Sequence, residues 1–292
     1  MAGNASGAVL VTGASTGIGR ATALLLDREG YRVFAGIRKD EDAKSLAEEG
    51  SERLKPIKID VAKERSIAAA KGTVSRALAD EGLVGLVNNA GIGVGGPVEF
   101  LELDQLRDTL EVNLVGQVAV TQAFLPLIRR ARGTIVFMAS IGGRVATPFL
   151  SPYSMSKFGV EALGESLRHE LQPWGIDVVV VEPGSIDTAI WGKGAETADD
   201  QLAAMPEDAR RLYSRQMERF VELLAETASR GIQPRKVAEV VWRAIQSDNP
   251  RHRYLVGIDA KIAARLKGYL PERAFSKVIG RQLKMPTDVP PE

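Results

Sequence analysis

The sequence predicts an α/β fold, a doubly wound parallel sheet of about seven strands with helices on both faces. Short apolar runs rich in β-branched residues alternate with helix-length segments along most of the chain. The runs are apolar throughout, which is typical of strands buried on both faces. A glycine-rich stretch, "VTGASTGIGR", includes the end of the first run. Because alternating strands and helices build parallel sheets through right-handed crossovers, these observations favour one sheet covered on both sides.

The apolar runs give the expected strands in order, and the segments between them give the expected helices. Strands are expected at 8–13, 31–37, 54–60, 82–91, 133–140, 176–184 and 253–258. Helices are expected at 17–29, 63–80, 104–131 and 153–173. The short runs match strands in length, and the longer segments match helices.

Composition excludes several classes of function. The 292 residues carry 38 Lys and Arg against 37 Asp and Glu, so no whole-chain field attracts nucleic acid or acidic lipid. With no cysteine and two histidines, neither a disulfide framework nor a Cys-based or His-rich metal site is expected. The first strand begins at Ala8, which leaves no room for a secretory signal, and no apolar run approaches the roughly 20 residues of a membrane span. We therefore expect a cytoplasmic protein without a metal.

We expect a single domain over 1–292, with a core at about 8–191 and 233–260. Residues 192–232 are polar and charged, yet 207–224 keep an apolar helical face formed by Leu212, Met217, Phe220, Val221 and Leu224. An insertion after the carboxyl end of a strand overhangs the crevice where ligands bind. We therefore interpret 192–232 as a substrate lid rather than a plain surface excursion.

The tail, 261–292, mixes seven basic and three acidic residues with apolar side chains. Packing on its own domain or on a second subunit is the favoured interpretation, and contact with a membrane surface is the alternative. Pro286, Pro290 and Pro291 predict that the last residues fray.

The glycine-rich stretch has the context that a dinucleotide site requires, after the first strand and at the start of the first helix. Gly13 allows a sharp turn, Gly17 lets the backbone approach a pyrophosphate, and Gly19 lets the helix pack closely on the strand. Free N–H groups at the helix start would then meet the phosphate charge. The other residues of this loop that we expect at the nucleotide are Ser15, Thr16 and Ile18.

The spacing TGxxxGxG resembles that of the short-chain dehydrogenase/reductase family. Further segments match the motifs of the family in order: "NNAG", the pattern Ser140-x12-Tyr153-xxx-Lys157, and "EPGSIDT". The resemblance covers residues 8 to about 190, and the last strand extends it to about 257. It implies a Rossmann-type sheet and an NAD(P)(H)-dependent oxidoreductase that interconverts a secondary alcohol and a ketone.

Cofactor choice depends on the end of the second strand. A carboxylate there would accept hydrogen bonds from a ribose 2′-hydroxyl, whereas a cation would favour the 2′-phosphate of NADP. Where NAD-dependent members of the family carry the acidic residue, this chain has Ile37, followed by Arg38 and Lys39. NADP(H) is therefore the expected cofactor, with Arg38 at the 2′-phosphate. NAD(H) stays open as the alternative, because three carboxylates follow at Asp40, Glu41 and Asp42.

The resemblance places further cofactor contacts at the ends of three other strands. These are Asp60 and Val61 at the adenine, Asn88 of the cofactor site, Ala90 and Gly91 near the ribose, and Pro183, Gly184 and Thr188 at the nicotinamide. The two adjacent amides of "NNAG" can also tie the fourth strand to its neighbours. Plain turns would also explain the Asn and Gly residues at these points.

Four residues match the family's catalytic set. Taken alone, Ser140 would be a strand-end turn serine, and Tyr153 and Lys157 would be a solvated i, i+4 pair on a helix. The resemblance implies that Tyr153 is the general acid/base and that Ser140 donates to the substrate oxygen. A cation beside a phenolate lowers its pKa, so Lys157 is expected to lower the pKa of Tyr153 and to bind the nicotinamide ribose. Asn113 matches the asparagine that bends a helix and holds a water linking Lys157 to solvent.

Within the family, the core segments look like the branch of retinol, hydroxysteroid and 3-hydroxybutyrate dehydrogenases. One departure is Ala139 before Ser140, where the family often has a second serine. The expected substrate is a small, apolar alcohol or ketone, and the expected assembly is a homodimer or homotetramer through the helices at 104–131 and 153–173. The alternatives are a non-catalytic nicotinamide-nucleotide-binding regulator and a sugar-nucleotide epimerase or dehydratase.

Overall fold

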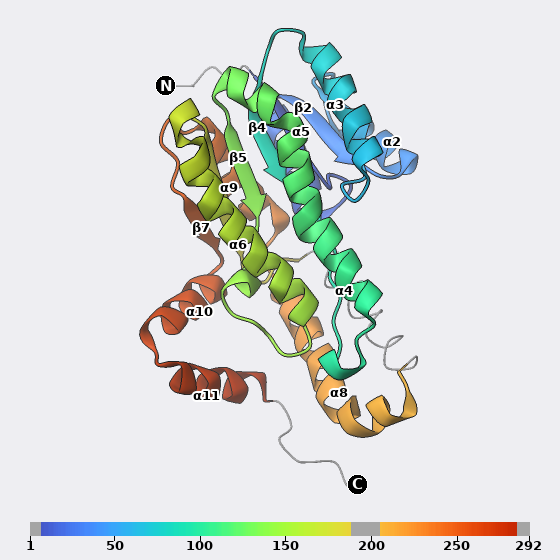
Figure 1. Cartoon of the computed structure of the whole chain (residues 1–292), viewed down its shortest axis with the longest axis vertical. Coiled ribbons are helices and arrows are strands. Elements are labelled where there is room, and N and C mark those ends of the chain that lie inside the picture. The colour runs from blue at the N-terminus through green and yellow to red at the C-terminus, as the bar shows by residue number, and fades with distance from the viewer. Residues whose placement is uncertain (1–6, 188–204, 285–292) are drawn as a thin grey trace.

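The computed structural model describes residues 7–187 and 205–284 and contains a seven-stranded parallel sheet (Figure 1). The strands lie in the order β3-β2-β1-β4-β5-β6-β7. Their bounds are β1 Ala8–Val11, β2 Arg32–Ile37, β3 Leu54–Lys58, β4 Leu83–Asn88, β5 Thr134–Met138, β6 Asp177–Pro183 and β7 Arg253–Val256. The strand order reverses between β1 and β4, which is where ligands bind in doubly wound sheets. The predicted fold class is confirmed.

Strand β1 shows why the runs are apolar throughout. Ala8 and Leu10 belong to the hydrophobic cluster on one face of the sheet, and Val9 and Val11 belong to the cluster on the other. Successive side chains of a strand point to opposite faces, so a strand between two helical layers buries both sets.

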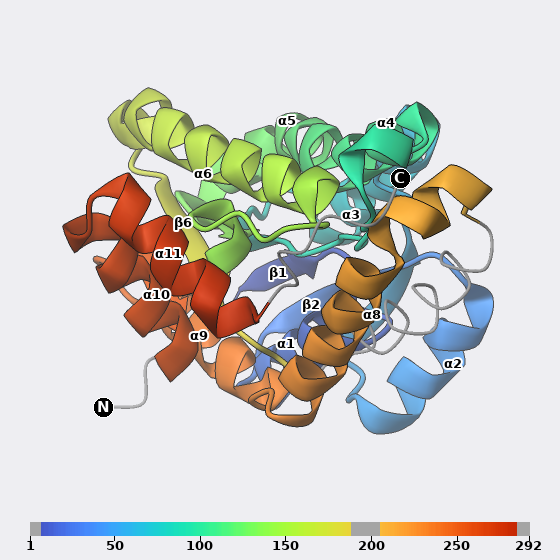
Figure 2. The same cartoon turned by 90° about the horizontal axis from the view of Figure 1, so that it is seen from below.

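One face of the sheet is covered by α3 Glu64–Leu78, α5 Gly116–Ala131 and α6 Ser151–Leu171 (Figure 2). Helix α6 approaches the sheet closely at Gly164, where a Cβ atom would lie 2.4 Å from Cγ2 of Val180. The other face is covered by α1 Gly17–Arg28, α2 Asp40–Glu49 and α9 Pro234–Gln246. Neither α2 nor α9 is among the helices expected above.

The expected helix at 104–131 is continuous but irregular. It begins as α4 Leu103–Leu110, passes through a π-helical turn, η2 Glu111–Val115, and continues as α5. A π-turn inside an α-helix often marks a functional site, and Asn113 lies within this one.

The same stretch bears on the expectation that the chain has no membrane span. The sequence suggests no apolar run near the length of a membrane span, yet an 18-residue window within Leu103–Ala131 has a mean hydropathy of 1.2, enough to cross a membrane by length and composition. However, Val120, Phe124 and Leu127 of α5 are buried against the sheet. Packing in the core therefore accounts for the apolar character of this helix.

The remaining helices lie beyond the sheet. They are α8 Glu207–Ser229, α10 Ile258–Tyr269 and α11 Glu272–Leu283, with short turns at η1 Val98–Phe100, η3 Ile141–Gly143 and η4 Gln172–Trp174. Figure 1 shows α8 and α11 past the carboxyl ends of the strands. Met217, Phe220 and Leu224 of α8 are buried against Phe149 and Leu150, which precede α6. Of the interpreted lid, only 205–232 lies within the described residues.

Candidate active site

The glycine loop between β1 and α1 has the conformation that its sequence requires. Gly13 and Gly17 have φ angles of 64° and 55°, in the left-handed region that favours glycine. A Cβ atom on Gly19 would lie 2.1 Å from the carbonyl oxygen of Gly13. The loop therefore closes tightly and directs the first N–H groups of α1 outward, an arrangement suited to phosphate.

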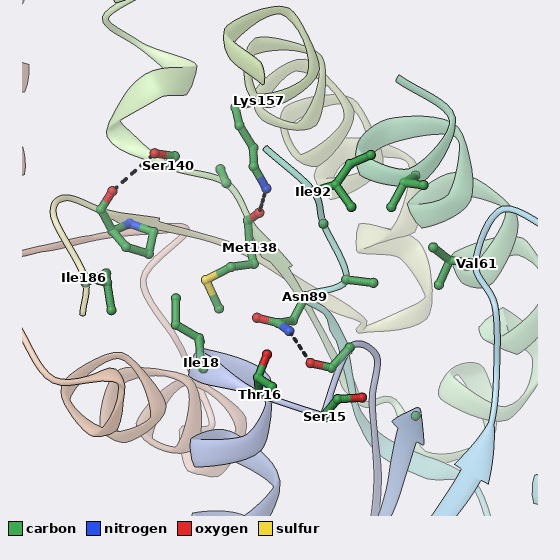
Figure 3. A pocket seen from close by; sticks show the side chains of 18 of the residues that line it. Ser15, Thr16, Ile18, Val61, Asn89, Ile92, Met138, Ser140, Lys157 and Ile186 are labelled. Atoms are coloured by element: carbon green, nitrogen blue, oxygen red, sulfur yellow. Dashed lines mark hydrogen bonds between the residues drawn. The ribbon is translucent and has the colours of Figure 1, made fainter. Parts of the chain in front are cut away.

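A cavity of about 190 Å³ extends from this loop along the carboxyl ends of the strands (Figure 3). It brings together thirteen expected site residues: Gly13, Ser15, Thr16, Gly17, Ile18, Arg38, Asp60, Val61, Ala90, Gly91, Ser140, Tyr153 and Lys157. Pro183 and Gly184 line it as well. Thr188 lies outside the described residues.

The two asparagines of "NNAG" have different positions. Asn88 is 1% exposed and turned into the protein, where its amide donates a hydrogen bond to Thr121 at 2.9 Å. Asn89 lines the cavity, and its amide donates to the carbonyls of Thr12 and Gly13 at 3.0 and 3.1 Å. The expected cofactor contact of Asn88 is therefore corrected: Asn88 ties β4 to α5, and Asn89 braces the glycine loop.

The end of β2 supplies Ile37 and Arg38 to the cavity wall. Asp40 does not line the cavity; its carboxylate accepts hydrogen bonds from Lys58 at 3.1 and 3.2 Å. Among the described lining residues the only acidic one is Asp60, after β3. This end of the cavity therefore presents the Arg38 cation after Ile37, together with the Asp60 carboxylate after β3.

Ser140 and Tyr153 meet at the other end. The Ser140 hydroxyl accepts a hydrogen bond from the Gly142 amide at 3.1 Å and lies 3.5 Å from the Pro183 carbonyl oxygen. Burial raises the pKa of Tyr153 above 10.0, and a side-chain hydrogen bond with Ser140 opposes that rise. The expected net lowering of the Tyr153 pKa is therefore not found, because desolvation of the phenolate outweighs the favourable hydrogen bond.

Lys157 is buried one turn beyond Tyr153 on α6. Its ammonium group donates to the Met138 carbonyl at 2.8 Å and lies 5.5 Å from the centre of the Tyr153 ring. Burial lowers the pKa of Lys157 from 10.5 to about 8. The cation is thus held close to the tyrosine, at a cost in desolvation.

Asn113 lies under the cavity wall rather than in it. Its side chain is 0% exposed and makes hydrogen bonds with both the amide and the carbonyl of Ile92, at 2.8 and 2.9 Å. Its amide also donates to the Ser156 hydroxyl at 3.1 Å. Asn113 therefore connects the π-turn, the strand-end loop and α6.

The turn after β6 is held by a residue that the sequence analysis did not single out. Asp259, at the start of α10, accepts a hydrogen bond from the Ser185 amide at 2.7 Å. Its carboxylate lies so close to Gly184 that a Cβ atom there would be 2.3 Å away. The segment after β7 thus holds the edge of the cavity.

Sequence reasoning missed most of the apolar wall. The additional lining residues are Gly36, Ile59, Ile92, Val112, Met138, Ala139 and Ile186. Such side chains carry the same pattern as core residues, so nothing in the sequence separates them from the core. The one available signal is the position of Ile59, Met138 and Ala139 at the ends of strands, where ligands bind in such sheets.

Comparison with known proteins agrees with this geometry. The family model described as short chain dehydrogenase matches residues 7–199. The chain belongs to the short-chain dehydrogenase family. It is an NAD(P)(H)-dependent oxidoreductase that interconverts secondary alcohols and ketones.

This dehydrogenase is 37% identical over 286 residues to 17-beta-hydroxysteroid dehydrogenase type 6 of Bos taurus, covering 95% of the chain and 89% of the relative. It is 39% identical over 263 residues to the mitochondrial D-beta-hydroxybutyrate dehydrogenase of Bos taurus, covering 85% and 76%. The predicted branch of the family is thereby confirmed. A solved short chain dehydrogenase from Burkholderia cenocepacia J2315 in complex with NADP has 25% identity and a TM-score of 0.71, covering 96% and 98%.

The expected cytoplasmic location of the dehydrogenase finds no support. One relative is mitochondrial by name. Among the described residues, no group of three or more His, Cys, Asp or Glu could hold a metal ion.

Proposed function

We propose that Tyr153 is the general acid/base of the reaction, that Ser140 donates a hydrogen bond to the substrate oxygen, and that Lys157 supports both. The observation that carries this proposal is their shared position: all three line the cavity that begins at the glycine loop. A proton donor, a hydrogen-bond donor and a cation then face the place where a nicotinamide would end.

The proton chemistry follows from the environment of Tyr153. The nicotinamide supplies or removes the hydride when it is bound. In reduction, the phenol gives its proton to the carbonyl oxygen of the substrate, and in oxidation the phenolate takes it from the alcohol. Because burial raises the pKa of Tyr153, the phenol stays protonated at neutral pH and is ready to act as an acid. The Lys157 ammonium nearby stabilises the phenolate left behind.

Asn113 is proposed as the support for a proton path from Lys157 toward solvent. Its side chain is satisfied by Ile92 and Ser156, so it orders the backbone around the path. The path itself would use a water held by this backbone, as the family resemblance implies.

Replacing Tyr153 by Phe tests the acid/base role. Turnover should fall by about 10²- to 10⁴-fold while cofactor affinity stays close to that of the parent, because only the proton donor is lost. Tyr254→Phe is the matched control, since Tyr254 lies on β7 outside the cavity lining. Retained turnover in Tyr153→Phe would remove the assignment.

We further propose a preference for NADP(H). Arg38 lines the cavity beside Ile37, whereas the nearby Asp40 is paired with Lys58. Arg38→Ala should weaken binding of NADPH by about tenfold or more and leave NADH nearly unchanged, because a charge-assisted bond to the 2′-phosphate is lost. Lys39→Ala serves as control, because Lys39 does not line the cavity. Equal losses for the two nucleotides would contradict this preference.

The proposed substrate is an apolar alcohol or ketone, of the hydroxysteroid kind named for a relative. Ile92, Val112 and Ile186 give the cavity an apolar wall, and α8 buries Met217 and Phe220 against the loop before α6. We propose α8 as part of the lid over this substrate, within one domain. A ketone series of rising hydrocarbon length, assayed with NADPH, should show kcat/KM rising with apolar area. A preference for short, charged ketones would count against it.

A further inference from the structure

Two buried carboxylates and two more exposed guanidinium groups contact one another, three of them close in sequence to residues of the cavity, and we call them the charge network: Arg144, Glu161, Glu182 and Arg253. Within the described residues, none of the four lines the cavity. Glu182 is 0% exposed, and the Glu161 side chain is 10% exposed. Within these four, two carboxylates face two guanidinium groups, and Arg253 also contacts a third, exposed carboxylate, Glu165, at 3.1 Å.

The contacts of the network join four different segments: the turn after η3, α6, β6 and β7. Arg144 donates to Glu182 at 2.8 Å, and a second of its nitrogens contacts the other oxygen of that carboxylate. Arg253 donates to Glu161 at 3.1 Å and lies 3.6 Å from Glu182. Every member therefore has an opposite charge within reach, and the four side chains form one connected group.

Three of the four segments also carry a residue of the cavity. Arg144 comes four residues after Ser140, Glu161 comes one helical turn after Lys157, and Glu182 directly precedes Pro183. The turn before Arg144 packs closely on α6, since a Cβ atom on Gly143 would lie 2.8 Å from the Lys157 carbonyl oxygen and 3.2 Å from Cγ of Glu161. A shift of any member would therefore move a part of the cavity.

We infer that the charge network positions the reacting groups: its members set turnover through Ser140 and Lys157 without touching substrate or cofactor. This inference rests on the proposed function, because it needs those two residues to take part in the reaction. The physical basis is that removing one member of a buried ion pair leaves the other charge without compensation. The segments around that charge must then move so that water can reach it. Misplacement by about 1 Å can lower turnover about 100-fold.

Glu161 gives the network a dependence on pH. Burial, followed by repulsion from Glu182, raises the pKa of Glu161 from 4.5 to about 7, and Arg253 opposes the rise. The charged groups that face it are Glu182 on β6, Arg253 on β7, Arg144 after η3, and Glu165 and Arg168 on α6. Protonation of Glu161 removes one of three carboxylates around Arg253, the others being Glu165 at 3.1 Å and Glu182 at 3.6 Å. The geometry should therefore change as the pH falls through about 7.

The main test is Glu182→Gln, which keeps the shape and removes the charge. We expect kcat to fall by about 10- to 100-fold while the dissociation constant of NADPH, measured by fluorescence, changes by less than about twofold. The kcat of the conservative variant Arg144→Lys should fall less than that of Glu182→Gln, since lysine keeps the positive charge and loses only the two-point contact with the carboxylate. The matched control is Asp27→Asn at the far end of α1, another buried carboxylate, paired with Ser51 at 2.6 Å.

Asp27→Asn should lose stability with an unchanged kcat, as a merely structural carboxylate would. An unchanged kcat in Glu182→Gln, or a loss no larger than that of Asp27→Asn, would overturn the inference. If Glu182→Gln does not fold, Glu161→Gln decides: the parent should show an inflection of kcat near pH 7 that this variant lacks, and a retained inflection overturns it. If Tyr153→Phe loses activity but Glu182→Gln keeps full activity, only this inference is overturned. If Tyr153→Phe stays active, the proposed function is overturned.

Discussion

The buried ammonium group of Lys157 donates a hydrogen bond to the Met138 carbonyl oxygen at 2.8 Å. Met138 ends β5, two residues before Ser140, so this bond connects α6 to the strand that carries the serine. The backbone of the sheet therefore holds the lysine in place, although burial destabilises its charged form.

Replacing Lys157 by Met should separate stability from function. The pKa of Lys157 falls from 10.5 to about 8 on burial, which corresponds to about 3 kcal/mol spent on holding the charged form at neutral pH. Lys157→Met should therefore have an unfolding free energy at pH 7 equal to or above that of the parent, with turnover lost. Urea unfolding measures the first and nicotinamide absorbance the second. Lys44→Met, at an exposed position of α2, should change neither.

The same variant gives a prediction on pH. The folded-state pKa of Lys157 lies below its unfolded value of 10.5, so between about pH 8 and 10.5 the unfolded chain binds more protons than the folded one. The stability contribution of Lys157 therefore rises with pH across that window. The advantage of Lys157→Met should shrink when unfolding is repeated at about pH 9.5. If the stability difference between Lys157→Met and the parent grew with pH, the pKa of Lys157 would not be lowered by burial.

Replacing Asn113 by Ala should cost both stability and turnover. The variant leaves the amide and carbonyl of Ile92 without their partner, and such buried groups cost about 2–4 kcal/mol together. The kcat should also fall, because Ile92 lines the cavity and would move. Asn249→Ala, in an exposed loop, is the control. Parent-like stability in Asn113→Ala would show that water replaces the amide without loss.

A methyl group at Gly164 should push α6 off the sheet. The added Cβ would lie 2.4 Å from Val180 Cγ2, and overpacking of this kind costs about 1–3 kcal/mol. Val180→Ala removes the opposing methyl groups, so the double variant should be more stable than the sum of the two single changes predicts. Additive effects in urea unfolding would mean that the helix does not rest on this contact.

We expect the protein to be a homodimer or homotetramer through the helix pair at 103–131 and 151–171. Met155 and Phe158 of α6 are 46% and 44% exposed, and Val115 of η2 is 47% exposed, although all three are apolar. Met155→Glu with Phe158→Glu should give a smaller species by sedimentation velocity, because charge opposes burial of this surface. Tyr269→Glu, on the exposed face of α10, should leave the assembly intact. A monomeric parent would contradict the expectation.

The features that follow from periodicity and strand ends could be predicted from sequence. The succession of strands along the chain, the glycine loop and the meeting of Ser140, Tyr153 and Lys157 depend on local patterns and on the rule that parallel strands end at one edge. The boundaries were less certain, since α6 begins at Ser151 rather than at Tyr153.

Other features depend on tertiary packing and could not be predicted. Asn88 and Asn89 are adjacent and identical, so only the register of β4 decides which one faces the cavity. The pKa of Tyr153 depends on desolvation, which no spacing reveals. The charge network joins residues up to 109 positions apart, from Arg144 to Arg253, and charged residues read one at a time look like solvated surface.

The bond from Ser185 to Asp259 also sets an order of events during synthesis. The two residues are 74 positions apart in the chain, and the strand beside β6 is β7, which leaves the ribosome just before Asp259. A growing chain that has already made the glycine loop, Ser140, Tyr153 and Lys157 still lacks the carboxylate that fixes the turn after β6. The edge of the cavity after β6 can therefore be completed only when Asp259 has left the ribosome, and we expect nascent chains that have not yet released this residue to hold NADPH weakly.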